Sequence, residues 1–319
     1  MIVLNVQKEL IQIVSWEDIV SRPGFNANLD PKTHTLKDVI GSYNFEDAVR
    51  CGLSNCHTPH NKGFIAVCTD GQETNVGQIC GSSYFGIDFE TMSRKHEEDV
   101  AEKRDRDNLG VFANRLDQLK KHIQDLRQQE HGADWVYRKL KPFTEGSGEI
   151  IEVVRLIKEM RRTGSSELVH VREATEEDVK SMELAQGRSL QRPQVIQERV
   201  GTVAGLEALY EENDLLKLLV VDLSENIKLF ETLKIDTLTR TQLRHHAKWA
   251  GTAQATLERA VSALASARRF LTLENLAPFA QVVSRKAADS FPVFLAHLLD
   301  IKPPLVAKTS KVKHKKKRR

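Results

Sequence analysis

The residues best able to do chemistry are four cysteines and two histidines, gathered in one short stretch of the chain. All the cysteines of the sequence lie within thirty residues, with both histidines beside the second one: Cys51, Cys56, His57, His60, Cys68 and Cys80. Clustered thiols in a reducing compartment indicate a metal site before they indicate disulfides. Zinc takes four deprotonated sulfur or nitrogen ligands in a tetrahedron. The alternative is a set of free, partly buried thiols.

A β-hairpin predicted within this stretch decides which of these side chains can meet. Residues 64–67 and 74–79 have the composition of strands, and the Asp-Gly pair at 70–71 is typical of a two-residue type I′ turn. This turn places Cys68 beside the tip of the hairpin and Cys80 at its base. Seven residues of strand at ~3.3 Å each then separate the two cysteines by about 23 Å, which excludes a shared metal.

The remaining candidates lie at the base of the hairpin or just before it. We therefore predict a structural zinc ion as the cofactor, with the ligands Cys51, Cys56, His60 and Cys80. His57 is the substitute for His60 in this set, and Cys68 is left outside it. A catalytic zinc would keep one position open and need a nearby carboxylate base. The nearest acids, Asp70 and Glu73, are expected at the hairpin tip, so a structural role is favoured.

The order of these features resembles that of zinc-ribbon and treble-clef modules in general. Cysteines come first, a hairpin follows, and the run Val-Gly-Gln-Ile-Cys-Gly at 76–81 leads into Tyr84, which stands where a further ligand would be expected. The resemblance covers about residues 51–90 and implies a small zinc-binding module. This segment holds one cation, Lys62, against four acids, so its net charge is −3. A phosphate-reading zinc finger should be basic, so we expect this module to fix a fold or to meet a protein.

Charge is distributed unevenly along the chain. The 47 Lys and Arg residues against 44 Asp and Glu residues give +3, but eight cations and no acid fall within residues 308–319. Removing those eight charges leaves −5 for residues 1–307, which excludes a uniformly basic nucleic-acid binder. The residues predicted to contact phosphates are Lys311, Lys313, Lys315, Lys316, Lys317, Arg318 and Arg319. Such a tail binds DNA or RNA without regard to sequence; the alternatives are a solubilising terminus or a nuclear-import signal.

The sequence pattern contains no membrane or secretion signal. No apolar run reaches the ~18 residues of a membrane span, because Lys217 and Asp222 interrupt the richest one. The first residues lack a basic segment and a cleavage site, so we expect no secretory signal. The predicted location is the cytoplasm, or the nucleus if the source is eukaryotic.

Around the cysteines, the apolar periodicity predicts a mostly helical protein with a small α+β region near its N-terminus. One seam has apolar residues at alternating steps of three and four, typical of a coiled-coil-like arm: Leu109, Phe112, Leu116, Leu119, Ile123 and Leu126. Residues 203–272 carry two further seams and predict an antiparallel helical hairpin. The predicted organisation is a mixed segment at 1–50, the zinc module at 51–90, the helical arm at 91–141, a linker and mixed α/β segment at 142–202, a helical domain at 203–305 and a disordered basic tail at 306–319.

These features favour a protein without catalysis. The sequence has no Walker A loop, no Gly-x-Gly-x-x-Gly after a strand, no Gly-x-Ser-x-Gly and no His-Glu-x-x-His, so no catalytic residue is assigned. The leading hypothesis is a non-enzymatic, zinc-containing nucleic-acid-associated factor that binds DNA or RNA through its tail and assembles through its helices. The second is a protein-interaction scaffold that docks partners, or a second copy, on its acidic zinc module and helical seams. The third is a metal-dependent hydrolase with an open metal site.

Overall fold

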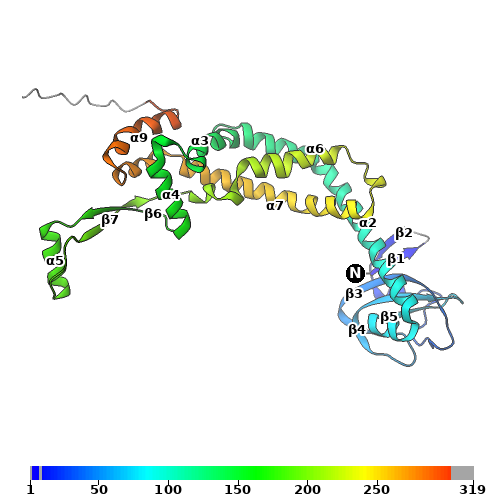
Figure 1. Cartoon of the computed structure of the whole chain (residues 1–319). Coiled ribbons are helices and arrows are strands. Elements are labelled where there is room, and N and C mark those ends of the chain that lie inside the picture. Colours follow the sequence, from blue (N-terminus) through cyan, green and yellow to red (C-terminus); the bar gives the residue numbers. More distant parts are fainter. Residues whose placement is uncertain (1, 7–8, 303–319) are drawn as a thin grey trace, which may run out of the picture. The chain divides into compact units, whose positions relative to one another are not determined.

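The computed structural model describes residues 2–6 and 9–302. Of the described residues, 59% are helical, and an antiparallel sheet lies near the N-terminus, which confirms the predicted class at that level (Figure 1). It forms a first unit of residues 1–114 and 233–250 and a second unit of residues 115–232 and 251–319. The predicted phosphate-binding residues at 311–319 lie outside the described residues. Within the described ranges, no helix is both long and apolar enough to cross a membrane.

The first unit is built on a five-stranded antiparallel sheet. Its strands are β1 (Ile2–Val6), β2 (Glu9–Ile13), β3 (Leu36–Arg50), β4 (Pro59–Cys68) and β5 (Glu73–Gly77), in the order β2-β1-β3-β4-β5. Consecutive side chains of a strand point to opposite faces. Phe64 and Ala66 enter one apolar cluster and Ile65 enters the other, so both faces of β4 are buried. A short helix, α1 (Trp16–Val20), begins at a capping box formed by Ser15 and Asp18.

The β4–β5 hairpin differs by one residue from the predicted register. Val67 pairs with Glu73, and the N–H of Cys68 donates to the carbonyl of Gln72 over 2.8 Å. The loop therefore has three residues instead of two, and its last residue, Gly71, has a φ of +87°. Three-residue hairpin loops have a left-handed residue, usually glycine, at their third position. The Asp-Gly pair therefore suits a three-residue loop as well as the two-residue turn that was predicted. Cys68 remains beside the tip.

The longest helix, α2 (Gln78–Gln128), has 51 residues and runs through both units. It replaces the end of the returning strand predicted at 74–79, because β5 ends at Gly77. Gly86 interrupts the helix with a φ of 65° and a ψ of −146°. The leucine and isoleucine residues of the predicted seam are all buried: Leu109, Leu116, Leu119, Ile123 and Leu126.

In the second unit, α2 packs with a helical hairpin of the same chain (Figure 1). The hairpin consists of a π-helical segment, η4 (Lys217–Glu225), that continues into α6 (Asn226–Glu231), and of the long helix α7 (Arg240–Phe270). Lys120 of α2 donates to Glu231 of α6 over 2.7 Å. The predicted hairpin is present, but its first arm begins later than residue 203, because the short 3-10 turns η2 (Leu206–Leu209) and η3 (Glu211–Asn213) precede it.

Most of the rest of the second unit is helical. Its remaining helices are α3 (Ala133–Glu145), η1 (Gly148–Ile150), α4 (Ile151–Thr163), α8 (Leu273–Leu276), η6 (Ala277–Gln281) and α9 (Arg285–Leu298). The short helix η5 (Ile235–Thr237), which precedes α7, belongs to the first unit. The rings of Phe143 and Phe270 pack edge to face at 5.2 Å in its core. A separate two-stranded antiparallel sheet, β6 (Glu167–Glu173) and β7 (Val195–Thr202), is connected through α5 (Glu176–Gln186). The helix α5 begins at a capping box of Thr175 and Asp178.

Candidate metal centre

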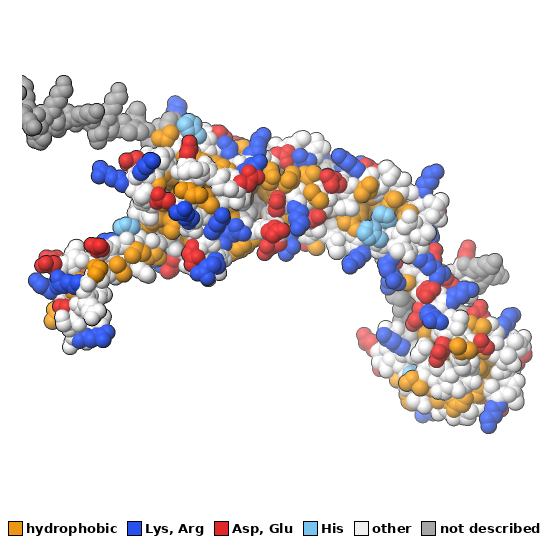
Figure 2. All heavy atoms as spheres, viewed as in Figure 1, with side chains coloured by type: hydrophobic (Ala, Val, Ile, Leu, Met, Phe, Trp, Pro, Cys, Tyr) orange, Lys and Arg blue, Asp and Glu red, His pale blue; other side chains and the backbone are white. Residues whose placement is uncertain are grey.

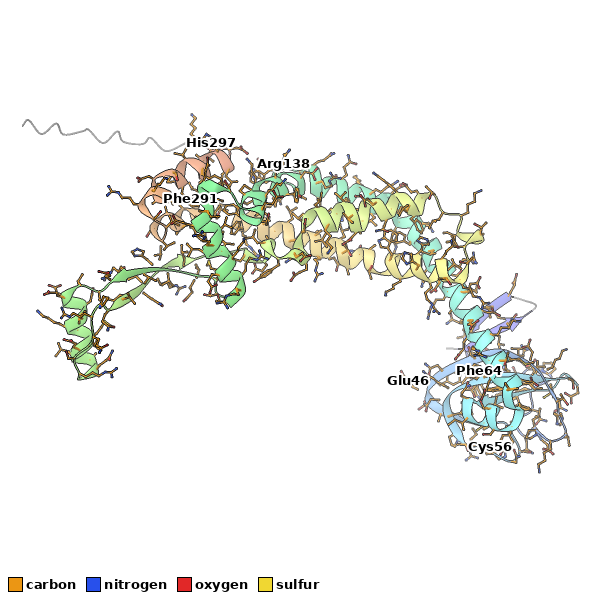
Figure 3. The ribbon with its side chains drawn as sticks, in the orientation of Figure 1. Glu46, Cys56, Phe64, Arg138, Phe291 and His297 are labelled. Carbon is orange, nitrogen blue, oxygen red and sulfur yellow. The ribbon has the colours of Figure 1, made fainter. Side chains whose placement is uncertain are left out.

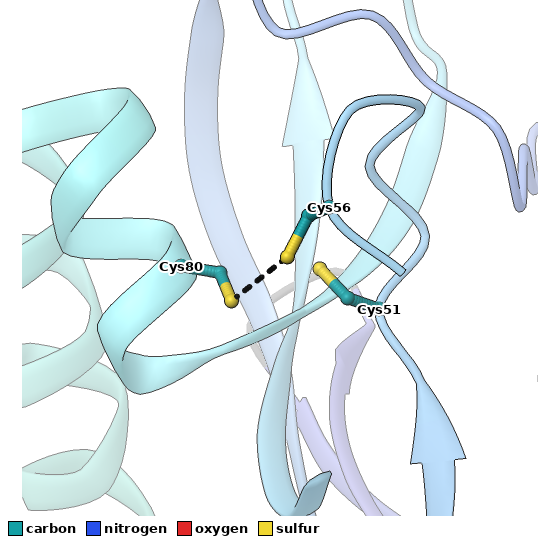
Figure 4. A group of neighbouring side chains, drawn as sticks. All are labelled: Cys51, Cys56 and Cys80. Carbon is teal, nitrogen blue, oxygen red and sulfur yellow. Dashed lines mark hydrogen bonds between the residues drawn. The ribbon is translucent and has the colours of Figure 1, made fainter. Parts of the chain in front are cut away.

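Three sulfur atoms meet where the loop between β3 and β4 approaches the first turn of α2 (Figure 4). The Sγ atoms of Cys51, Cys56 and Cys80, called the cysteine centre below, all lie within 4.8 Å of one another, and those of Cys56 and Cys80 are 3.3 Å apart. A tetrahedral zinc ion at ~2.3 Å from each sulfur separates its ligands by about 3.8 Å. The three side chains therefore have the chemistry and the spacing to hold one metal ion.

The loop that carries the first two cysteines is fixed by main-chain hydrogen bonds. The N–H of Cys56 donates to the carbonyl of Leu53 over 3.1 Å, and the N–H of Gly52 donates to the carbonyl of Asn75 in β5 over 2.8 Å. A Cβ atom at Gly52 would lie 2.2 Å from Oγ1 of Thr74. Only glycine therefore lets this loop approach β5 so closely.

Cys80 lies just beyond the base of the hairpin, as predicted, but it reaches the centre from the first turn of α2, because β5 ends at Gly77. The ring of Phe89 lies against Gly81, where a Cβ atom would come within 2.2 Å of it. Phe89 also packs edge to face on Phe64 of β4, with 5.6 Å between the ring centroids. Phe64 and Cys56 are both labelled in Figure 3. This packing holds the first turn of α2 against the sheet.

The three thiols differ in acidity. Burial raises the pKa of Cys56, but hydrogen bonds of its sulfur with Thr58, Cys80 and Cys51 outweigh burial and lower the pKa to about 7. Burial also raises the pKa of Cys51. Burial and the hydrogen bond with Cys56 raise the pKa of Cys80 to about 12. Cys56 is therefore the first of the three to ionise, and a divalent cation has to displace the protons of the other two.

His60, the predicted fourth ligand, does not belong to this group of three. Its Nε2 lies 2.5 Å from the hydroxyl oxygen of Tyr43, and its Nδ1 lies 3.1 Å from the carbonyl oxygen of Thr58. A carbonyl only accepts, so Nδ1 carries the proton and Nε2 accepts from Tyr43. Tyr43 in turn accepts a hydrogen bond of 3.2 Å from Nδ2 of Asn75. Both ring nitrogens of His60 are thus engaged in hydrogen bonds.

The two other candidates also lie outside the cysteine centre. His57 is exposed, has a φ of 52°, and places its Nδ1 3.2 Å from the carbonyl oxygen of Cys51. Cys68 is completely buried at the far end of β4, where burial, and then the charge of Asp70, raise the pKa of its thiol to about 11. Its place agrees with the prediction that strand length separates Cys68 from the other thiols.

The acids predicted at the hairpin tip are engaged there. Glu73 accepts two hydrogen bonds from the guanidinium of Arg22, of 2.6 and 2.8 Å, and Asp70 lies 3.4 Å from His34. In the part of the chain that the structure describes, no carboxylate belongs to the ligand group of the cysteine centre. The ligand group of the cysteine centre therefore offers no carboxylate base of the kind that hydrolysis at a metal needs.

Sequence reasoning missed the residues that let the three cysteines meet. Gly52 follows Cys51, Gly81 follows Cys80, and a Cβ atom at either glycine would collide with a buried neighbour. Gly77 ends β5, and a Cβ atom there would lie 3.1 Å from the ring of His60. A glycine directly after a cysteine, found twice here, is the signal in the sequence that points to these close approaches.

Comparisons with protein-family models, with curated proteins and with solved structures find no match for this chain. The chemistry of the cysteine centre is therefore inferred from its own donor atoms and their surroundings.

Proposed function

We propose that this protein is a non-enzymatic, zinc-containing factor that associates with nucleic acid. The observation that carries the proposal is the tail, because residues 308–319 hold eight cations and no acid, whereas residues 1–307 carry −5. A cationic segment displaces counterions from phosphates, and its affinity for DNA or RNA falls steeply with salt. The tail contains no Phe, Tyr or Trp that would stack on bases, so we expect binding without sequence preference.

The charges of the described body support this assignment, because many of its cations are paired with acids. Arg240 at the start of α7 contacts three acids of α2, and Arg172 of β6 contacts two acids. Figure 2 shows Lys and Arg side chains interspersed with Asp and Glu over the visible face of the helices. Mixed and paired charges produce little net attraction for phosphates. The tail is therefore the segment to which we assign the contact with nucleic acid.

The cysteine centre favours a structural zinc ion within this proposal. Zinc bound there would tie the loop after β3 to the start of α2, and so fix the sheet to the long helix. Three thiolates outweigh the charge of Zn²⁺, which weakens the acidification of a bound water molecule. With no carboxylate in the described ligand group, these donors favour a structural role over hydrolysis.

Fluorescence anisotropy with labelled DNA and RNA of unrelated sequences tests the role of the tail. The full chain should bind all of them, and its affinity should fall about 10³–10⁵-fold between about 50 and 200 mM salt, as about six to ten phosphate contacts require. Removal of residues 308–319 should abolish this binding. A tail with every lysine replaced by arginine should bind like the natural one, whereas a tail with every lysine replaced by glutamine should bind weakly.

Equal affinity of the truncated and full chains at low salt would place the contact elsewhere and overturn the proposal. Circular dichroism of each variant controls for loss of folding. Cys80→Ser provides a second control, because it alters the cysteine centre and leaves the charge of the tail unchanged.

One feature of the second unit favours a protein-interaction scaffold as the second candidate. β6 and β7 form a sheet of only two strands, and apolar side chains are exposed on it and on α5: Val171, Leu184 and Val195. A two-stranded sheet is marginally stable in water, so a covering partner would stabilise it. The predicted seam is less suited to docking, because Leu116 and Leu119 are only 8% and 9% exposed. Affinity purification with and without nuclease separates the candidates, since a docked protein would survive nuclease treatment.

A further inference from the structure

The cysteine centre lacks a fourth donor among the described side chains. A tetrahedral zinc ion takes four ligands, and only three thiols meet within 4.8 Å in the described ranges. His60 lies on β4, but its two nitrogens are hydrogen-bonded to Tyr43 and Thr58. Its ring also packs against Gly77, where even a Cβ atom would lie 3.1 Å away. His60 would have to break both hydrogen bonds and leave this contact to bind the metal.

His57 is no better placed to complete the centre. It directly follows Cys56 in the loop, where its backbone has a φ of 52°. Its Nδ1 lies 3.2 Å from the carbonyl oxygen of Cys51, and its side chain is exposed. Cys51 is buried, whereas Cys56 and Cys80 are partly exposed. The side of the centre next to Cys56 and Cys80 is therefore the side that solvent reaches.

We propose that a zinc ion in the cysteine centre keeps its fourth position open and binds there an external neutral nitrogen donor, an imidazole group. The proposal rests on the metal centre proposed above and adds an exchangeable ligand to it. Charge favours a neutral donor, because three thiolates already outweigh Zn²⁺ and residues 51–90 carry −3, so a neutral ligand adds no further negative charge. Neutral imidazole is a common zinc ligand. A small imidazole compound and a histidine side chain share this chemistry.

Three apolar side chains of α2 are exposed within seven residues of Cys80 in the sequence. Ile79 and Ile87 are 82% and 77% exposed, and Tyr84 is exposed as well. A histidine flanked by apolar residues in a peptide would gain contacts here that free imidazole cannot make.

Cobalt substitution of the full-length protein tests the open position, because the visible absorption of Co²⁺ reports its ligands. We expect a thiolate-rich spectrum that shifts saturably when imidazole is added. A blocked Leu-His-Leu peptide should produce the same shift, and a Leu-Gln-Leu peptide should produce none. A peptide that saturates at lower concentration than imidazole assigns the ligand to a polypeptide, whereas equal concentrations assign it to a small molecule. X-ray absorption of the zinc form should show three sulfur neighbours and one oxygen, with nitrogen replacing oxygen when imidazole is present.

A cobalt spectrum that does not change when imidazole is added, and that already indicates a nitrogen ligand, would overturn the proposal. The chain would then supply the fourth ligand of the site itself. His57→Ala and His60→Ala would identify that ligand, since the variant that lacks it would gain the response. On our proposal both variants, and the control Cys68→Ser, respond as the natural protein does. A chain that takes up no Co²⁺ would overturn the metal centre as well. Nucleic-acid binding by the tail would persist in either case. Failure of the tail assignment can therefore be distinguished from failure of the open position and from failure of the metal centre.

Discussion

Gly52 and Gly81 illustrate how residues without donor atoms control the chemistry of the cysteine centre. A side chain at Gly52 would collide with Thr74, and one at Gly81 would collide with the ring of Phe89. Each glycine follows a cysteine and lets that cysteine come close to a neighbouring element. The three thiols are therefore positioned by the close packing of the backbone around them as much as by their own spacing in the sequence.

At the same scale, the three cysteines were predictable and the role of His60 was not. Clustered thiols near the base of a hairpin meet for geometric reasons, and strand length alone separates Cys68 from them. His60 instead forms a hydrogen bond with Tyr43, which lies seventeen residues earlier on the neighbouring strand. Spacing along the chain does not reveal such a cross-strand pair, so the sequence could nominate His60 as a ligand but could not show its actual partner.

Alkylation with iodoacetamide should distinguish the cysteines one by one. In the zinc-loaded protein all of them should react slowly, because thiolates bound to the metal are protected. After chelation, Cys56 should be modified first, because it is partly exposed and the pKa of its thiol is lowered to about 7. Cys68 should stay unmodified until the protein unfolds, because it is completely buried. Mass spectrometry of the digested protein measures each site, and equal reactivity of Cys56 with and without chelator would contradict metal binding there.

At the scale of the elements, α2 was predictable in its apolar pattern and unpredictable in its partner. Periodicity identified the seam, and its leucines are indeed buried. A seam of this kind fits a second copy, another protein or the chain's own helices equally well, and only the structure assigns it to α6 and α7 of the same chain. The π-helical segment η4 was also not predicted, because the additional apolar residues around it obscure any single face.

Two leucines at the start of this helical hairpin form a matched pair for testing its packing. Leu223 is completely buried, whereas Leu216 is 42% exposed. Leu223→Ala should lower the free energy of unfolding by about 2–5 kcal/mol, because it removes buried methyl groups and leaves a cavity. Leu216→Ala should change it by roughly 0.5 kcal/mol or less. Urea unfolding followed by circular dichroism measures both, and similar midpoints for the two variants would contradict the packing of η4.

At the scale of the whole molecule, metal chemistry and phosphate affinity are assigned to different parts of the chain. The cysteine centre belongs to the first unit, and the cationic tail ends the sequence. The tail is distinguished by the sequence alone, because its run of like charges, with Val312 as the single apolar residue of 308–319, stands out in composition. The division into two units was not predictable, since α2 and α7 each pass through both units and show no break in composition at the boundary.

The metal content of the purified full-length chain tests the cysteine centre most directly. Elemental analysis should find about one zinc ion per chain, as a single tetrahedral site requires. Cys51→Ser, Cys56→Ser and Cys80→Ser should each lose it. Cys68→Ser makes the same chemical change outside the centre and should retain the metal. A natural chain that contains no metal after growth with added zinc, or a Cys68→Ser variant that loses the metal as fully as Cys80→Ser, would contradict the three-cysteine centre.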